Sequence, residues 1–468
     1  MLRIYNTLSK RLDDFEPYDK NNVGMYTCGP TVYDFTHIGH CRKYTLDDII
    51  KRSLGYLGFK VRHVMNITDV GHLSSDQDDG EDKIEKGARK YGKTVWEVAE
   101  FFTRDFFDTM NNMNIVPADV ICKATEHIAE QIEIIKSLFE KKLAYETSTA
   151  VYFDVSKFPT YTKLSGQDLS QKEVGVREEI NVDPEKKNPA DFVLWFKRTG
   201  RFKNHVMHWD SPWGDGFPGW HIECSAMSMK YLGDQFDIHT GGVDHISVHH
   251  TNEIAQSEGM SGKQPFVKYW IHHEHLLVNG EKMSKSTGNV FRLTDLEKLG
   301  YEALDLRYFF LTAKHRVPQN FTFDALESAK KSRKKLVRQV NQLSSVLSET
   351  KQTKEESESD NDFKTKFVSA IEDDFNIPIA LSIVWEVLKS DLSPKSKLQT
   401  ILEFDKVLGL NLDKCLNDPK TKSIPQKARE LIEKRDIARK NKDWATADEI
   451  RQRLKAEFDI EVADHSVC

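Results

Sequence analysis

Apolar residues in the first seventy positions switch between strand-like runs and helical spacing. Residues 23–27 form a short apolar run, which predicts a buried strand, and residues 59–65 predict a second one. Between them, apolar residues recur at helical spacing, at Leu46, Ile49, Ile50, Leu54 and Leu57. The order strand, helix, strand is typical of a parallel nucleotide-binding sheet.

The hydrophobic pattern changes twice further along the chain. Residues 147–206 are rich in turn residues with short strands such as 150–153, which predicts an insertion that interrupts the sheet. A loop dense in Trp, Pro and Gly then returns the chain to a strand at 235–239. From position 323 onward the spacing is helical, with one amphipathic helix at 325–348 and a last helical pair at 425–457.

Composition narrows the class of protein. Charged residues make up 30% of the 468 positions, and no apolar run nears the roughly 18 residues of a membrane span. The first residues lack the apolar core of a secretory signal. The six cysteines are too widely spread for a disulfide framework, so we expect cytoplasmic thiols. A net charge of −6 argues against wholesale coating by nucleic acid but permits local basic patches.

Two kinds of ligand chemistry follow the first predicted strand. Cys28 ends the strand, and His37 and His40 stand at the start of the predicted helix. Ligands of open parallel sheets bind beyond the carboxyl ends of strands, opposite helix N-termini. The two imidazoles and the helix dipole are therefore suited to stabilise charge on a phosphate, and Gly39 permits close approach. Taken alone, such a pair is more often two structural histidines.

A second candidate phosphate-binding segment lies far downstream, at residues 281–289. It places Lys282, Lys285, three hydroxyls and Gly288 on one loop. The lysines are point charges suited to a pyrophosphate leaving group, and the glycine suits a loop that closes on substrate. An ordinary solvated loop is the alternative, although the two segments together are far more specific than either.

A third group of residues predicts a metal site. Cys224 is expected in the first turns of a helix, where the dipole favours a thiolate, and His249 and Glu253 are expected on one side of another helix. Cys28 joins them only if the two halves of the sheet adjoin. Two thiolates, an imidazole and a carboxylate suit Zn²⁺. From spacing alone, a buried apolar cysteine and a core histidine are the more ordinary interpretation.

The two phosphate-binding segments, His37-Ile-Gly-His40 and Lys282-Met-Ser-Lys-Ser286, resemble the paired signatures of the class I aminoacyl-tRNA synthetases. Residues 26–34, 219–224 and 249–257 resemble, more narrowly, the cysteinyl-tRNA synthetases, and the similarity covers almost the whole chain. The resemblance implies a Rossmann-type domain that activates an amino acid with ATP and passes it to tRNA.

The resemblance also implies roles for individual residues. One Zn²⁺ per chain is expected on Cys28, Cys224, His249 and Glu253. Catalysis is expected from His37, His40, Lys282 and Lys285. ATP, accompanied by Mg²⁺, is expected at Thr31, His37, Gly39, His40, Lys282, Met283, Ser284, Lys285 and Ser286. The substrate cysteine is expected at Gly29, Thr68, Trp220 and His239, the last two of which fit equally well as packing residues.

A zinc site makes physical sense for such a substrate. Cysteine must be distinguished from serine, which has nearly the same shape, and pocket shape alone discriminates weakly between such molecules. A zinc ion with an exchangeable position binds the substrate's sulfur as a thiolate. A serine hydroxyl is a far less acidic ligand and would be rejected.

Two basic stretches mark the helical part. Residues 330–338 hold six basic residues and no acids, and residues 427–455 hold ten Lys or Arg against six Asp or Glu, around Trp444. Aromatic and basic side chains together read single-stranded RNA, although charge alone more often means a solvated helix face. The resemblance favours tRNA, through residues 373–376 and the Trp444 segment. Family members usually continue past Ile460 with a Gly- and Trp-containing tail, so we expect a changed anticodon contact.

The expected fold is α/β, a Rossmann-type parallel-sheet catalytic domain with an inserted connective subdomain, followed by an all-α helical bundle and a C-terminal anticodon-binding domain. The expected parts are the first half of the Rossmann domain (1–122), the connective insertion (123–206), the second half of the Rossmann domain (207–278), the stem-contact region with the KMSKS loop (279–322), the helical bundle (323–412) and the anticodon-binding domain (423–468).

We expect a cytoplasmic monomer with no membrane partner that joins L-cysteine to tRNA(Cys) with the use of ATP. Two alternatives remain. An ATP-dependent ligase that joins cysteine to an amino sugar would share both signatures and the zinc, but residues 323–468 speak against it. A catalytically inactive, zinc-containing RNA-binding module is the other, and the two intact signatures speak against it.

Overall fold

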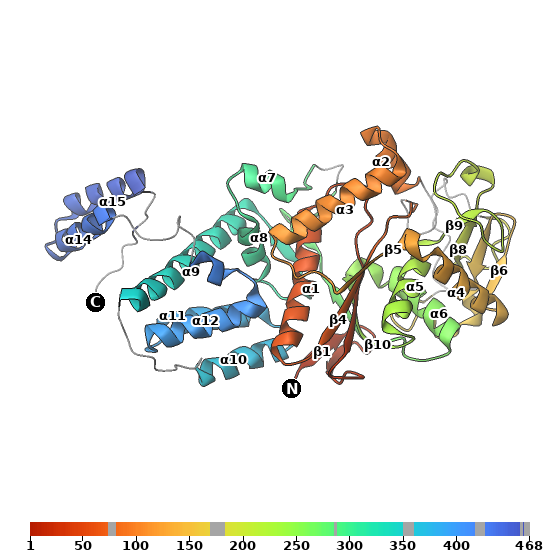
Figure 1. The fold of residues 1–468 in the computed structure, drawn as a ribbon, viewed down its shortest axis with the longest axis horizontal. Coiled ribbons are helices and arrows are strands. Elements are labelled where there is room, and N and C mark those ends of the chain that lie inside the picture. Colours follow the sequence, from red (N-terminus) through yellow and green to blue (C-terminus); the bar gives the residue numbers. More distant parts are fainter. Residues whose placement is uncertain are drawn as a thin grey trace.

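A computed structural model gives the structure of residues 1–73, 81–168, 183–284, 288–349, 360–416, 426–458 and 462. The molecule is elongated, with the sheets at one end and a helical arm at the other (Figure 1). The predicted Rossmann-type sheet, its insertion and the helical C-terminal part are all present. Among the described helices, none combines the length and apolarity needed to cross a membrane.

Five parallel strands form the central sheet, in the order β11-β10-β3-β4-β5. They are β3 (Val23–Thr27), β4 (Val61–Ile67), β5 (Val120–Lys123), β10 (Phe236–Gly242) and β11 (Val267–His273). The pairing of β10 with β3, with Ile238 opposite Met25, joins the two halves of the chain at the centre of the sheet. This meets the condition under which Cys28 can join the downstream metal ligands.

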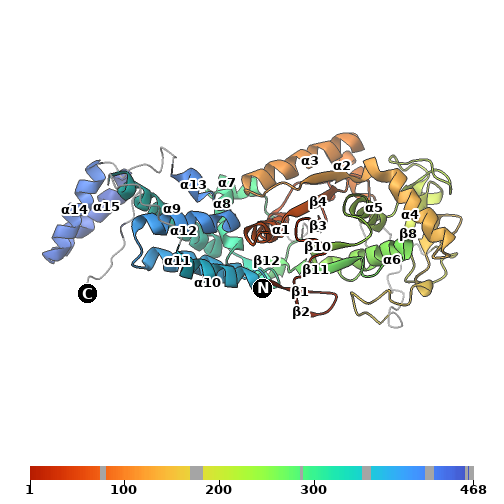
Figure 2. The ribbon, with the colours of Figure 1, turned by 60° about the horizontal axis from the view of Figure 1, so that its bottom comes forward.

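Helices cover both faces of this sheet (Figure 2). The helices around it are α1 (Ile38–Tyr56), α2 (Lys83–Tyr91), α3 (Val95–Asn112), α4 (Ile128–Glu140), α5 (Trp220–Leu232) and α6 (His249–Ser261). Met25 packs with Ile50 and Leu54 of α1. The next residue, Tyr26, packs on the opposite face with residues of α5 and α6, because successive strand side chains alternate.

The second strand begins two residues later than its apolar run predicts. The run starts at position 59, but β4 starts at Val61. Gly58 adopts a φ of +90°, and the amide of Phe59 donates to the carbonyl of Leu54. Phe59, the first apolar residue of the run, therefore belongs to the turn that ends α1, and β4 begins after it.

The insertion forms an antiparallel sheet in the order β6-β7-β8-β9. Its strands are β6 (Ala144–Glu146), β7 (Ala150–Phe153), β8 (Phe192–Lys197) and β9 (Gly216–Pro218). β9 lies beyond position 206, in the segment expected to return to the Rossmann domain, yet it pairs with β8 through Trp195 and Pro218. The insertion sheet thus takes a strand from the Trp-, Pro- and Gly-rich loop.

The remaining strands lie at the edges of the catalytic part. They are the pair β1 (Arg3–Asn6) and β2 (Arg11–Asp14) and the three-stranded sheet of β12 (Leu276–Val278), β13 (Glu281–Lys282) and β14 (Gln319–Phe321). Short 3-10 helices occur at η1 (Ala124–His127), η2 (Val155–Lys157), η4 (Gly200–Phe202) and η5 (Val243–His245).

The helical arm begins with α7 (Leu293–Lys298) and α8 (Ala303–Phe310). It continues with α9 (Phe323–Glu349), α10 (Asn361–Glu372), α11 (Ile377–Lys389), α12 (Pro394–Leu408), α13 (Leu412–Cys415), α14 (Gln426–Lys440) and α15 (Trp444–Phe458). α9 confirms the long amphipathic helix, and α14 and α15 confirm the last helical pair. α13 begins at the expected end of the helical bundle, and its first residue, Leu412, is fully buried.

A buried arginine fastens the helical arm to the catalytic part. Arg307 of α8 is fully buried, and its Nη2 lies 2.5 Å from Asp48 Oδ2 on α1. Its Nε donates to the carbonyl of Leu408 at 2.8 Å, and Nη1 donates to that of Met113 at 3.0 Å. Removing either member of such a buried pair costs roughly 3–5 kcal/mol, so the position of the arm relative to α1 is strongly specified.

Candidate active site

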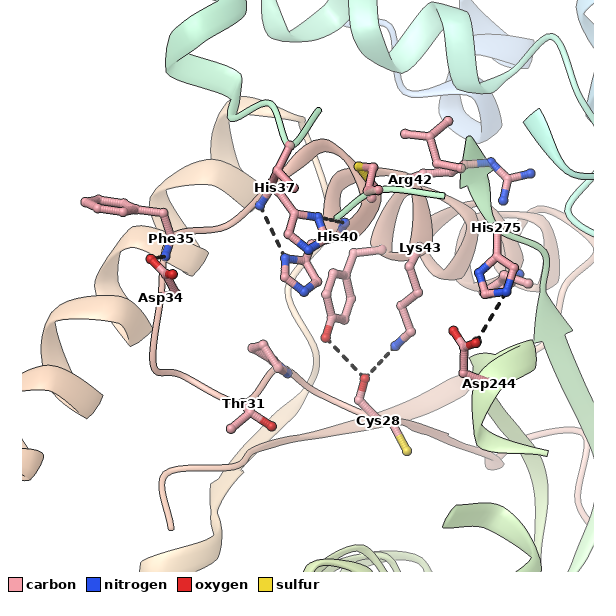
Figure 3. A pocket seen from close by; sticks show the side chains of 18 of the residues that line it. Cys28, Thr31, Asp34, Phe35, His37, His40, Arg42, Lys43, Asp244 and His275 are labelled. Carbon is pink, nitrogen blue, oxygen red and sulfur yellow. Dashed lines mark hydrogen bonds and ion pairs between the residues drawn. The ribbon is translucent and has the colours of Figure 1, made fainter. Parts of the chain in front are cut away.

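A cavity of about 780 Å³ opens at the carboxyl ends of β3 and β10 (Figure 3). Its walls include many of the predicted site residues, from the two signature segments and from elsewhere in the chain. Those that line it are Cys28, Gly29, Thr31, His37, Gly39, His40, Trp220, Lys282 and Met283. The sequence prediction that ligands meet this edge of the sheet and the start of α1 therefore agrees with the shape of the molecule.

His37 and His40 form the N-terminus of α1. His37 is the N-cap, its Nδ1 accepts from the amide of His40 at 3.4 Å, and the amide of His37 donates to His40 Nδ1 at 3.3 Å. The two rings stack with centroids 3.7 Å apart. Each Nδ1 is thus engaged by the helix backbone, and both rings stand at the positive end of the helix dipole, beside the cavity.

The two signature segments touch each other. A Cβ placed on Gly39 would lie 2.3 Å from the methyl carbon of Met283, so a larger residue there would displace the Met283 side chain. The amide of Ile38 also donates to the carbonyl of Phe291, at 2.9 Å. The downstream loop is thus anchored on the first turn of α1 at both of its ends.

The downstream lysine that the structure describes is exposed. The Nζ of Lys282 lies 4.0 Å from Asp244 Oδ1, and its side chain is 71% exposed. The amide of Ser284 donates to Asn289 Oδ1 at 2.7 Å, which closes the base of the loop. Lys285 and Ser286, predicted for catalysis and ATP binding, lie outside the described residues.

The chain after β3 is fitted tightly against the end of β4. A Cβ on Gly29 would lie 1.5 Å from the carbonyl oxygen of Asn66, and the amide of Gly29 donates to Asn66 Oδ1 at 2.7 Å. Thr31 and Thr68 form a parallel β-bridge, and Thr68 is buried. Gly29 is therefore required by packing as well as by any ligand that approaches its backbone.

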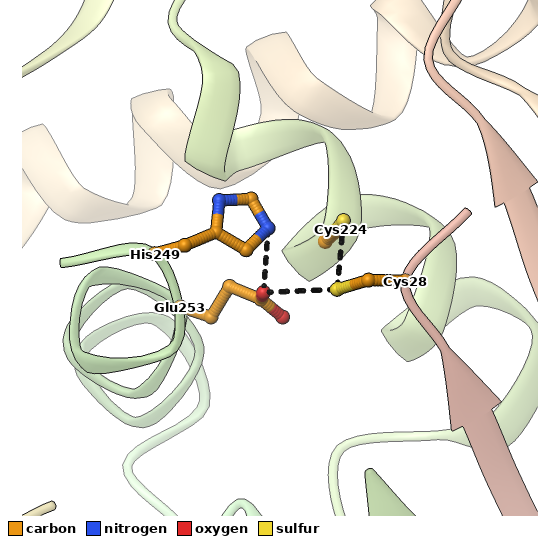
Figure 4. A group of neighbouring side chains, drawn as sticks. All are labelled: Cys28, Cys224, His249 and Glu253. Carbon is orange, nitrogen blue, oxygen red and sulfur yellow. Dashed lines mark hydrogen bonds and ion pairs between the residues drawn. The ribbon is translucent and has the colours of Figure 1, made fainter. Parts of the chain in front are cut away.

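The four predicted metal ligands lie together beneath the cavity (Figure 4). One donor atom from each of Cys28, Cys224, His249 and Glu253 lies within 4.8 Å of the others, and all four residues are buried. The two Sγ atoms are 4.0 Å apart, and His249 Nε2 is 3.0 Å from Glu253 Oε1. A tetrahedron with Zn–S bonds of about 2.3 Å has an S–S edge of about 3.8 Å, so the donors fit zinc in both kind and spacing.

Histidines surround this group as a second layer. His249 Nδ1 lies 2.8 Å from Nδ1 of His221, which leaves Nε2 of His249 facing Glu253. His239 Nε2 is 2.9 Å from Glu253 Oε2. Partners of this kind fix the orientation of metal ligands.

A second group shares two of the ligands, and the sequence prediction did not include it. It combines Cys28 and Glu253 with His239 and His250, whose Nε2 lies 3.3 Å from Cys28 Sγ. His250 Nδ1 in turn is 2.8 Å from His272 Nε2. The pair of adjacent histidines at 249 and 250 was visible in the sequence, but only the packing of α6 against the end of β3 shows that both approach Cys28.

The two thiols differ in their affinity for a proton. Burial opposes ionisation, but the Cys224 thiol and the His250 ring hold the pKa of Cys28 well below its usual value. Burial and the neighbouring Cys28 raise the pKa of Cys224 well above its usual value. A divalent cation would bind both as thiolates, and its binding would release a proton.

Trp220 and His239, the two residues with alternative interpretations, lie in different environments. Trp220 begins α5, lines the cavity and packs on His249, with ring centroids 4.6 Å apart. His239 is fully buried, stacks on Trp270 and holds Glu253, and it does not line the cavity. Trp220 can therefore contact a molecule in the cavity directly. His239 can act on such a molecule only indirectly, through its contact with Glu253.

Lys43 also lines the cavity, and sequence reasoning missed it. Its Nζ donates to the carbonyl oxygen of Cys28 at 2.5 Å and lies 3.0 Å from Asp47 Oδ2 (Figure 3). Asp47 Oδ1 accepts from His273 Nε2 at 2.8 Å. Burial opposes its charge, yet Lys43 and His273 hold the pKa of Asp47 well below its usual value.

The two basic stretches of the arm have different surroundings. In α9, Arg333 is buried and bonds Asp305 at 2.7 Å and Glu302 at 2.8 Å, and Lys330 Nζ donates to the carbonyl of Gly300. These cations hold α9 against the preceding segment. In the last pair of helices, Trp444 is 58% exposed, and the Arg439 guanidinium lies 5.7 Å from its ring centroid.

Comparison with known proteins agrees with this geometry. Residues 14–331 match the model of the tRNA synthetases class I (C) catalytic domain. A cysteine–tRNA ligase of Treponema denticola is 44% identical over 97% of this chain and 96% of its own length. Cysteine–tRNA ligase 1 of Burkholderia lata is 42% identical over 97% of this chain and 94% of its own.

Solved structures of more distant proteins share the fold. Mycobacterium tuberculosis methionyl-tRNA synthetase with methionyl-adenylate aligns with a TM-score of 0.57 at 15% identity, over 86% of this chain and 92% of its own. A LeuRS–tRNA–LeuAMS complex from Agrobacterium radiobacter aligns with a TM-score of 0.60 at 11% identity, over 85% and 86%. With the near-complete matches above, the chain belongs to the cysteine–tRNA ligase family of class I tRNA synthetases.

Proposed function

We propose that this protein activates L-cysteine with ATP and transfers it to the 3′ end of tRNA(Cys). The observation that carries the proposal is the position of Cys28. Its side chain belongs to the metal group, while its backbone lines the cavity that contains His37 and His40. A substrate thiol at the metal and a phosphate at α1 would therefore share one cavity. Full-length similarity to proteins named cysteine–tRNA ligase supports the same conclusion.

We assign one Zn²⁺ to Cys28, Cys224, His249 and Glu253. When bound, the ion would take the thiolate of the substrate as a further ligand and would leave serine unbound. His221 and His239 orient His249 and Glu253 from the second layer. Trp220, which packs on His249 at the cavity wall, closes this end against water.

In the first reaction, an oxygen of the cysteine carboxylate attacks the α-phosphorus of ATP. The new O–P bond forms as the bond to the β-phosphate breaks, and pyrophosphate leaves with its Mg²⁺. His37 and His40 stabilise the phosphates at the start of α1. Lys282, together with Lys285, neutralises the departing pyrophosphate, and Gly39 lets the adenosine end approach the backbone. These groups act by position and charge rather than by covalent bonding.

In the second reaction, a hydroxyl of the terminal ribose of tRNA takes the cysteine from the adenylate. We propose that α14 and α15 contact the anticodon, with Trp444 stacking on a base and the surrounding cations holding phosphates. The protein is proposed to act in the cytoplasm as a monomer.

Cysteine-dependent exchange of pyrophosphate into ATP, followed by charging of total tRNA, tests this function. Cysteine and serine are compared side by side. We expect exchange and charging with cysteine and neither with serine. Exchange without charging would favour the amino-sugar ligase, and binding of RNA without exchange would favour the inactive RNA-binding module.

A further inference from the structure

Lys43 lies one turn beyond His40 on the same face of α1. Residues three apart on a helix are neighbours, and both line the cavity. Figure 3 shows the Lys43 side chain reaching from α1 to the carbonyl group of Cys28. The ammonium group therefore lies in the cavity that the histidine pair lines, against the residue assigned to the metal.

The ammonium group is held rigidly. One N–H donates to the carbonyl oxygen of Cys28 at 2.5 Å, and the ammonium forms an ion pair with Asp47 Oδ2 at 3.0 Å. Asp47 is itself fixed by His273 Nε2 at 2.8 Å, and its side chain is 3% exposed. The ammonium also lies 4.2 Å from the centroid of the Tyr44 ring, and Lys43 lines the cavity.

The reaction needs a cation at this point. The carboxylate of the amino acid and the α-phosphate of ATP are both anions and must come within bonding distance. A preorganised positive charge between them reduces their repulsion and stabilises the charge that develops on the phosphoryl oxygens. The Lys43 ammonium lies in the cavity where the two anions are proposed to meet, and its side chain is 16% exposed against 71% for Lys282.

Resting on the proposed function, we propose that Lys43 is a further catalytic cation, which binds the substrate carboxylate and the α-phosphate while the bond between them forms. No proton is transferred in this step. The carboxylate oxygen donates the electron pair for the new O–P bond, and pyrophosphate leaves with the pair from the bond that breaks. Lys43 stays protonated throughout, held by Asp47.

The test compares Lys43→Met with Lys51→Met in pyrophosphate exchange. Lys51 is a matched control, because it lies two turns further along α1, pairs with Asp119 at 3.2 Å and is about as buried, 13% against 16% exposed. We expect kcat of Lys43→Met to fall about a hundredfold, as for loss of one charge-stabilising donor. KM for cysteine should change far less, and Lys51→Met should match the wild type.

Zinc content and partial rescue separate catalysis from structure. Both variants should retain the zinc content of the wild type, and Lys43→Arg should recover part of the rate. Lys43→Gln keeps a donor for the Cys28 carbonyl without the charge and should be as slow as Lys43→Met, so it replaces that variant if Lys43→Met does not fold.

A normal kcat in Lys43→Met or Lys43→Gln would overturn the proposal, as would a loss of rate that merely follows loss of zinc. An inactive wild type would instead overturn the proposed function itself.

Discussion

The catalytic part and the terminal pair of helices, α14 and α15, are built in opposite ways. Around the metal group, His239, His250 and Glu253 are completely buried, and each has a polar partner. Among the described side chains of the terminal pair, the core cluster consists of Ala428, Ile450 and Leu454, with partly buried apolar neighbours. Its largest aromatic side chain, Trp444, is on the surface.

This difference follows from what each part is proposed to bind. Buried polar groups are costly unless they are paired, and a network of them fixes ligand atoms in place for one small substrate. A long polyanion is instead held by many exposed cations and by stacking, which need little core. Damage to the first part should therefore abolish chemistry, and damage to the second should weaken RNA binding while chemistry continues.

The largest effect is expected from Cys224→Ser. Loss of one thiolate from a buried metal group should remove most of the zinc, and cysteine-dependent exchange should fall by at least about a thousandfold, because affinity for the thiol and its orientation are lost together. Metal analysis and exchange kinetics measure this. Binding of tRNA should be almost unchanged. Full exchange activity in zinc-free protein would refute the proposed metal function.

A smaller effect is expected from His40→Asn. Asparagine retains an acceptor near the amide of His37, but the imidazole that faces the phosphate is lost. Exchange should slow about a hundredfold, the usual effect of one charge-stabilising group. Zinc content should equal that of the wild type, since His40 is not in the metal group. A variant as active as the wild type would mean that the histidine pair only caps the helix.

The third effect concerns stability against pH. Burial lowers the pKa of His63 to about 4, from 6.5. Between these values the unfolded chain binds a proton that the folded chain does not, so stability is complete above pH 6.5 and falls as the pH falls toward 4. The contribution of this ring is on the order of 3 kcal/mol. Residues 361–458 contain no histidine, so the helices from α10 to α15 should lack this dependence.

Unfolding of the wild type and of His63→Gln at several pH values measures this contribution. The variant should lose less stability on acidification, and the comparison cancels any loss of zinc that both proteins share. Equal pH slopes for the two proteins would show that the ring is protonated as readily in the folded state.

The smallest effect is expected from Trp444→Ala. Base stacking on an aromatic ring is worth roughly 1–3 kcal/mol, so charging of tRNA should fall about tenfold at limiting tRNA. Pyrophosphate exchange should not change, because the residue is remote from the cavity. Ile437→Ala is a suitable control, since Ile437 is equally exposed, at 58%, but has no ring to stack. Equal charging by both variants would remove Trp444 from the RNA contact.

Much of the fold was predictable, because its signals are local. The spacing of Leu46, Ile49 and Leu54 predicted α1, and the apolar run at 23–27 predicted β3 with its correct bounds. β9 was not predictable, because its three residues lie in a loop of Pro and Gly, and only the partner strand β8, remote in the sequence, gives them a sheet.

The site was predictable only in part, for a related reason. The four metal ligands were identified through motifs, and their convergence depends on the pairing of β10 with β3, which no local pattern encodes. Lys43 resembles any other charged helix residue in the sequence, and only its contacts with Cys28 and Asp47 distinguish it. Arg333 belongs to a basic stretch that suggested a surface patch. In the structure it is buried and bonds to the carboxylates of Glu302 and Asp305.

The contact of Gly39 with Met283 links the two signature segments through a single methyl group. That group lies where the Cβ of any larger residue at position 39 would stand. A change at position 39 would therefore be felt on both sides of the cavity, because it would displace Met283 as well as alter the first turn of α1.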